Sequence, residues 1–196
     1  LLIVLVIPAI FAPLIAPHDP LDAPGGIRVR LQPPVFAGGT WDHVLGTDKA
    51  GRDVLSRVIY GSRVSIVISL IGIGIAGSIG ITLGLISGYY GGIVDATIMR
   101  LVDTSLSIPP VLLALSLATA LDPSFTTVIL VVGALLWSIY CRQVRGDTLA
   151  VREQDYISRA RVSGAGAGRI MIKHILPNIT NTVIVLATLQ VGFVIL

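Results

Sequence analysis

The sequence predicts an all-α protein that crosses a membrane several times, and its composition and charge pattern carry this prediction. Only 13% of the 196 residues are charged, whereas 54% are hydrophobic. A soluble domain usually carries about 25% charged residues. The chain also contains long windows with no charged residue at all. A helix needs about 20 apolar residues to cross a hydrocarbon core of roughly 30 Å, so these windows are candidate membrane spans.

Five charge-free windows predict five spanning helices. They cover residues 1–17, 64–94, 104–121, 123–140 and 175–196. Because the chain starts and stops inside apolar runs, we expect the first helix to lack its cytoplasmic flank and a sixth helix to follow. The predicted organisation is a first helix at 1–17, a loop at 18–63, three helices within 64–140, a loop at 141–176 and a fifth helix at 177–196.

The two long hydrophilic loops predict the orientation. Lys and Arg in short loops stay on the cytoplasmic side of a membrane. The loop at 141–176 has few acidic residues and is rich in basic ones, namely Arg142, Arg145, Arg152, Arg159, Arg161, Arg169 and Lys173. The loop at 18–63 is rich in Pro and Gly, and aspartates offset its basic residues. We therefore expect 141–176 inside and 18–63 outside.

Glycines mark the second expected helix. Gly80, Gly84 and Gly88 recur every four residues, and small residues at this spacing let membrane helices approach closely. We interpret them as a packing face. The following "GYYGG" (residues 88–92) predicts a turn at the membrane face. Beyond it, Arg100 and Asp103 are spaced to pair on a helix.

Two prolines stand near the start of the third expected helix. In "SIPPVLLAL", Pro109 and Pro110 either occupy the first turn or kink the span. The fourth helix is expected to end near Tyr140, with Cys141 as a reduced thiol at its end.

Several chemistries have no sequence support. No GxxxxGK[ST] nucleotide loop occurs, and no nucleophile–base arrangement is evident, so no catalytic residue is assigned. His18, His43 and His174 are far apart and lack metal-ligand spacing, so no metal site is expected. The basic residues flank spans rather than forming a face with aromatics, which disfavours nucleic acid as a partner. The five windows hold no ionisable residue of the kind that marks a proton pathway, so the energy source lies elsewhere.

The basic stretch at 157–178 is the most unusual segment of the chain. Residues 151–163 can form a short helix, which Gly164 can close in the left-handed conformation. A second short helix can follow from Ala165 to Ile175, and Pro177 suits the first turn of the fifth span. From the residues alone, this segment is either a solvated cytoplasmic loop or a surface on which another protein docks.

The segment resembles the signature loop of permease subunits in ABC importers. "YISRARVSGAGAGRIMIKHILPN" (156–178) has the glycine at position 164 and the Leu176-Pro177 ending, with Arg161, Arg169 and His174 as in the peptide-transporter branch. At the EAA position of that loop the chain instead reads Ser158-Arg159-Ala160. The acidic residue of the EAA element, a glutamate, is thus absent, so any contact that the family makes through it is in doubt here.

Two further stretches resemble the dipeptide/oligopeptide/nickel group of these permeases, the DppC/OppC type. One is "HVLGTDKAGRDVLSRVIYGSRVS" (43–65), and the other is "GYYGGIVDATIMRLVD" (88–103). In the first stretch, the matching motif residues are His43, Gly46, Thr47, Asp48, Gly51, Arg52, Asp53 and Arg57. This motif is expected outside, where it meets a binding protein, caps the cavity or simply forms a turn cluster.

The resemblance implies a type I ABC importer permease fold in the plasma membrane of a bacterium or archaeon. It implies as partners, besides membrane lipid, a second homologous permease, two cytoplasmic ATPases that hold ATP and Mg²⁺, and an extracytoplasmic solute-binding protein. This chain would bind no cofactor and would not be an enzyme. The residues expected to couple to the ATPases are Tyr156, Ser158, Ala160, Arg161, Gly164, Ala165, Arg169, His174, Leu176 and Pro177.

The cargo follows only from the same resemblance. Dipeptides and oligopeptides are the expected substrates, and nickel chelates or glutathione fit the same motifs. A stand-alone channel or secondary carrier is the alternative from another class, and a membrane-embedded enzyme is a further one. The lack of ionisable residues in the windows disfavours a carrier, and the lack of a catalytic constellation disfavours an enzyme.

Overall fold

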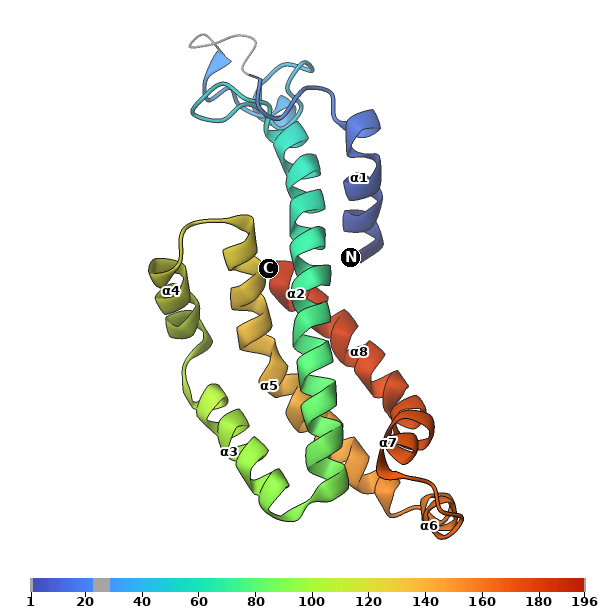
Figure 1. Ribbon diagram of the computed structural model, residues 1–196. Helices are drawn as coiled ribbons and strands as arrows, with labels where there is room; N and C mark the ends of the chain where they lie inside the picture. The colour runs from blue at the N-terminus through green and yellow to red at the C-terminus, as the bar shows by residue number, and fades with distance from the viewer. Residues whose placement is uncertain (1, 23–28, 196) are drawn as a thin grey trace. The chain divides into compact units, whose positions relative to one another are not determined.

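The computed structural model of the protein describes residues 2–22 and 29–195 and is helical over most of that length (Figure 1). Residues 1, 23–28 and 196 lie outside the described ranges, and Arg28 of the predicted first loop is among them. In the described residues, the sole extended pairing is an isolated bridge between Thr47 and Asp53. The chain divides into two compact units, Leu1–Val67 and Ile68–Leu196.

The first unit begins with a short, bent helix. Helix α1 covers Leu2–Ile15, contains Pro8 and Pro13, and has a non-helical residue at Phe11. Each proline removes a backbone donor, and its ring disturbs the preceding turn. With 14 residues α1 is shorter than the roughly 20 that a full crossing needs, so the expected span at 1–17 is not confirmed.

Helix α2 covers Val54–Tyr90 and starts ten residues earlier than the sequence predicted. The reason is a helix cap, because the backbone N–H of Ser56 donates to Asp53 Oδ2 at 2.7 Å. An aspartate in this position stabilises a helix by about 1 kcal/mol. The predicted loop 18–63 therefore ends at Asp53, and it contains the short 3-10 turn η2, Val35–Ala37.

The second unit contains a helix pair where one span was expected. Helices α3 (Gly92–Ser107) and α4 (Pro110–Ala120) are bent by 87° relative to each other. Ile108 is extended because the ring of Pro109 disfavours a helical residue before it, and Pro110 starts α4. The span expected at 104–121 is therefore broken at Pro109, in line with the alternative in which the two prolines kink it, and the turn predicted in "GYYGG" is confirmed.

Helix α5 covers Phe125–Arg152 and is capped by Ser124, whose side chain accepts from the Thr127 N–H at 3.1 Å. It continues twelve residues beyond Tyr140, so the prediction that a loop begins at 141 is wrong. Cys141 is consequently buried within the helix rather than placed at its end. The charged side chains of this extension find partners on a neighbouring helix, which lets the helix continue.

Two of these partnerships involve α3. Arg145 donates to Asp95 at 2.5 and 2.6 Å, and Ser87 of α2 donates to the same carboxylate. Asp103 pairs with Arg142 instead of Arg100, so the predicted Arg100–Asp103 pair is wrong. The three helices α2, α3 and α5 thus meet in one polar network.

The last part of the chain is a short helix, a turn and a long helix. Helix α6 covers Asp155–Val162, and the long helix consists of α7 (Ala167–Ile170), the π-helical turn η3 (Met171–Ile175) and α8 (Leu176–Ile195). Pro177 therefore lies inside a continuous helix, whereas the sequence predicted that it would occupy the first turn of a new one. A proline ring clashes with the carbonyl four residues earlier, and the wider π turn before Pro177 accommodates it.

In the described residues, three helices are long and apolar enough to cross a membrane, or four if the bent pair counts as one span. The three are Val54–Tyr90, Phe125–Arg152 and Ala167–Ile195. Within the second unit α5 contacts α3, α4 and α8. Its buried side chains form two apolar clusters with residues of α2 and of the long C-terminal helix.

Candidate functional site

The expected packing glycines lie in a tight seam between α2 and α5. A Cβ atom on Gly80 would come within 2.5 Å of the Trp137 carbonyl oxygen. On Gly84 it would lie 2.7 Å from the Cys141 carbonyl oxygen, and on Gly88 it would lie 2.7 Å from Thr148 Cβ. The two helices can approach this closely only because these positions lack a side chain.

The candidate coupling segment (residues 151–177) has a well-defined turn after α6. Gly164 has φ +80°, so the left-handed conformation predicted for it is confirmed. The Ala165 N–H donates to the Ala160 carbonyl at 3.0 Å, and the Gly164 N–H donates to the Arg161 carbonyl at 3.1 Å. This bond pair is the Schellman motif, which fixes the direction in which the chain leaves a helix.

Three isoleucines anchor the coupling segment to the helices. Ile157 of α6, Ile170 of α7 and Ile175 of η3 are fully buried. They pack in one cluster with Leu85 of α2 and Val144 of α5. Truncating such a side chain to alanine costs about 2–5 kcal/mol. The sequence analysis missed these anchors, although isolated isoleucines in a basic stretch are a readable signal.

The predicted coupling residues remain largely accessible around these anchors. Tyr156, Ser158, Arg161, Gly164, Arg169 and Pro177 are exposed, and Ala160, Ala165, His174 and Leu176 are half-buried. Val162 at the end of α6 is 90% exposed despite being apolar. A concavity of about 400 Å³ lies beside the turn, lined by Ala160, Ser163, Ala165, Arg169, Lys173 and His174.

Arginines join the coupling segment to the end of α2. The Arg161 guanidinium lies 5.9 Å from the centre of the Tyr89 ring, within the range of a cation–π contact. Arg152 donates to the carbonyls of Gly88 at 3.0 Å and Tyr89 at 3.3 Å. These carbonyls belong to the last turn of α2, and a cation is favourable there. Sequence spacing did not indicate the pairing with Tyr89.

The motif at 43–57 is organised around Asp48 in the first unit. Asp48 Oδ1 accepts from the backbone N–H groups of Ala50 at 2.8 Å and Arg52 at 3.0 Å. Its Oδ2 accepts from the side chains of Arg52 and Arg57. These contacts lower the pKa of Asp48 from its ordinary 3.8 to about 2. The backbone N–H of Arg52 contributes most, and the Ala50 N–H and the Arg52 guanidinium also lower the pKa, whereas partial desolvation raises it.

Three further motif positions shape the loop. Gly46 has φ +74°, and a Cβ there would collide with the carbonyl oxygen of Gln32. Thr47 Oγ1 accepts from the Gln32 N–H at 2.9 Å and donates to the Val29 carbonyl. Gly51, also with positive φ, forms the turn after Asp48. These motif residues thus make their contacts within the loop.

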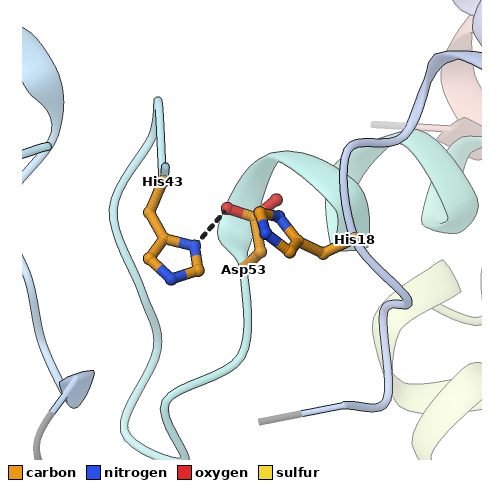
Figure 2. Close-up of side chains that lie close together, drawn as sticks. All are labelled: His18, His43 and Asp53. Atoms are coloured by element: carbon orange, nitrogen blue, oxygen red, sulfur yellow. Dashed lines mark hydrogen bonds and ion pairs between the residues drawn. The ribbon is translucent and has the colours of Figure 1, made fainter. Parts of the chain in front are cut away.

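His43 and Asp53 are brought together at the start of α2, and His18 joins them (Figure 2). His43 Nδ1 lies 3.1 Å from Asp53 Oδ1. Burial opposes ionisation of Asp53, but hydrogen bonds from Ser56 and His43 outweigh it and lower the pKa of the carboxyl. No spacing rule had connected His18 to the motif, so the sequence analysis missed this cluster.

Comparison with known proteins decides the family. Residues 80–196 match the family described as binding-protein-dependent transport system inner membrane component. The chain belongs to this family. It is therefore a permease-family protein of the membrane with several apolar helices, and the resemblance predicted from the motifs is confirmed at the level of the family.

Relatives within this permease family carry peptide-transport names. The chain is 39% identical to the dipeptide transport system permease protein DppC of Haemophilus influenzae, over 96% of this chain and 63% of the relative. It is 40% identical to the probable D,D-dipeptide transport system permease protein DdpC of Escherichia coli, over 100% of this chain and 63% of the relative. The chain thus spans somewhat less than two thirds of the length of these relatives.

Proposed function

We propose that this chain is a transmembrane permease subunit of an ATP-driven importer for dipeptides and oligopeptides. In this proposal it forms the pathway with a second, homologous permease. Two cytoplasmic ATPase subunits bind ATP and Mg²⁺, and an extracytoplasmic solute-binding protein delivers the peptide. The chain itself performs no hydrolysis and binds no nucleotide. Family membership and the names of the relatives support the proposal.

The observation that carries the proposal is the geometry of the coupling segment. The segment is anchored by Ile157 and projects an exposed surface of arginines and small residues around the Gly164 turn. We infer that this surface docks on an ATPase subunit.

Movement of the docked segment would reach the membrane helices directly. Ile157 packs in the same cluster as Leu85 of α2 and Val144 of α5, and Arg161 lies over Tyr89 near the end of α2. A packed cluster transmits displacement because interiors are close-packed. Closure of the ATPases would therefore shift α2 and α5 rather than deform a flexible loop.

On the outer side, we assign the motif at 43–57 a structural role in presenting the loop. Its charged residues bond to one another, whereas Phe36 and Trp41 are 83% and 81% exposed. Exposed aromatic side chains are frequent contact residues at protein interfaces. In this proposal, Phe36 and Trp41 contact the solute-binding protein.

The substitution Gly164→Asp tests the docking role. The site has open space, because among the described residues no atom beyond the two chain neighbours lies within 4 Å of an added Cβ, so the new carboxylate would reach a partner. We expect uptake of a labelled dipeptide in proteoliposomes to fall at least about tenfold, equivalent to about 1.4 kcal/mol of coupling. ATP hydrolysis should continue without uptake, and the protein should remain in the membrane.

Gly164→Asn is the matched control. Asparagine tolerates positive φ and is similar in size to aspartate, but it is neutral. It should retain uptake within about twofold, because a small change in propensity at an exposed turn costs only a few tenths of a kcal/mol. Normal uptake by Gly164→Asp would remove the docking role from this segment.

A further inference from the structure

A cluster of metal-ligating side chains lies outside the coupling segment. It consists of His18, His43 and Asp53 (Figure 2). One ring nitrogen of each histidine and one carboxylate oxygen of Asp53 all lie within 4.8 Å of one another. The two imidazole rings have their centres 4.9 Å apart. These three residues belong to three different segments of the first unit: the stretch after α1, the loop after η2, and the residue before α2.

Burial distinguishes this cluster from an ordinary group of surface charges. His43 is 6% exposed and Asp53 is 1% exposed. His18 Nδ1 is buried and has no hydrogen-bond partner. Buried polar atoms nearly always have a partner, so a ring nitrogen without one points to a missing ligand. A cation bound by the cluster would use this nitrogen.

The surrounding hydrogen bonds orient the ligands. Ser56 is fully buried; its N–H donates to Asp53 Oδ2 at 2.7 Å, and its hydroxyl accepts from the His18 backbone N–H at 3.0 Å. Asp53 Oδ1 lies toward His43. Ser56 thereby fixes one ligand by its side chain and another by its backbone. Such outer contacts hold metal ligands in place and raise affinity.

We propose that His18, His43 and Asp53 form a binding site for one first-row divalent cation of the zinc class. Two imidazoles and a carboxylate, with solvent in a fourth position, suit Zn²⁺, whereas Mg²⁺ and Ca²⁺ prefer oxygen ligands. Tetrahedral bonds of about 2.1 Å place ligand atoms about 3.4 Å apart. Closing the widest present spacing, 4.8 Å, to that value requires side-chain rotations that bring the ligand atoms about 1.4 Å closer together.

The bound cation clamps the loop. It joins the stretch after α1 to the loop around His43 and to the first turn of α2. Crosslinks that close loops stabilise the folded state by reducing the entropy of the unfolded chain. The inference stands on the geometry of the first unit and does not depend on the identity of the transported solute.

The test is zinc binding by the full-length protein purified in detergent and stripped of metal with a chelator. Zn²⁺ is added with a competing chromophoric chelator, and the bound metal is counted by mass spectrometry after gel filtration. We expect one Zn²⁺ per chain and no retention of Mg²⁺. His18→Gln, His43→Gln and Asp53→Asn should each weaken binding more than about tenfold, since even losing an outer-shell contact costs 10- to 100-fold.

Two features make the test discriminating. Asparagine can still cap α2, so Asp53→Asn separates ligation from folding. His174→Gln is the matched control, because it removes the only other histidine of the chain. Zn²⁺ should raise the unfolding temperature of the parent and of His174→Gln, and should not raise that of the three cluster variants. Absence of stoichiometric zinc, or equal zinc binding by Asp53→Asn and the parent, would overturn the site and leave a hydrogen-bonded helix cap.

Discussion

Asp48 illustrates how single residues shape the loop before α2. One carboxylate accepts two backbone N–H groups and the side chains of Arg52 and Arg57. Because hydrogen bonds to the ionised form lower a carboxyl pKa, the folded loop favours the charged state. The residues that look like an interaction motif in the sequence therefore find their hydrogen-bond partners within the loop. The aromatic side chains around them are the part of the loop that is exposed.

The pH dependence of the loop follows from this carboxylate. The pKa of Asp48 is lowered from 3.8 to about 2, so its stabilising contribution is present above about pH 3.8 and is lost as the pH falls toward 2. We expect hydrogen–deuterium exchange in residues 44–57, corrected for intrinsic rates, to increase as the pH falls from 3.8 toward 2.

The variant Asp48→Asn isolates this effect. It keeps an acceptor for the backbone N–H groups but loses the ion pairs, so exchange should be faster at neutral pH and should change less between pH 4 and pH 2. An unchanged pH profile in this variant would assign the transition to another group, with Asp53 as the next candidate.

At the scale of helices, the seam between α2 and α5 depends on absent side chains. Small residues at Gly80, Gly84 and Gly88 let α2 reach the backbone of α5, and Ala76 continues the same face and is fully buried. The spacing was readable in the sequence. The partner helix was not, because any other apolar helix could have provided the opposing surface.

Gly80→Ala tests the seam. The added methyl overlaps Tyr140 and the Trp137 carbonyl, and overpacking of this kind costs about 1–3 kcal/mol. We expect a lower unfolding temperature in detergent. Gly74→Ala is the control on the same helix, since in the described part of the chain no atom outside its own helical turn lies within 4 Å of the added Cβ, and it should be neutral or slightly stabilising. Equal behaviour of the two variants would contradict close packing at Gly80.

At the scale of the whole molecule, the topology prediction rests on α5. This helix separates the link after α4 from the coupling segment, and the positive-inside rule assigns the coupling segment to the cytoplasm. Leu121 in the link is 41% exposed and Val162 is 90% exposed. The two positions therefore report on opposite ends of one span.

Cysteine labelling measures this topology. Leu121→Cys should react with a membrane-impermeant maleimide from outside intact cells, and Val162→Cys should react only after the cells are opened. Cys141 is fully buried, so the parent protein should remain unlabelled and serves as the control. Labelling of both variants from the same side would mean that α5 does not cross the membrane.

The sequence by itself determined the helical membrane class, the family and several breaks in the helices. The membrane class depends on composition and the breaks depend on local backbone chemistry, as at Gly91, Pro109 and Gly164, whereas the family follows from the resemblance of the motifs. The helix ends were harder to predict. Helix α5 continues past Arg145 because the carboxylate of Asp95 in α3 pairs with the Arg145 side chain. Tertiary structure alone decided that contact, the choice of α5 as partner of the glycine face, and the meeting of His18 with His43 and Asp53. Such contacts join segments far apart in the chain, and no local spacing encodes them.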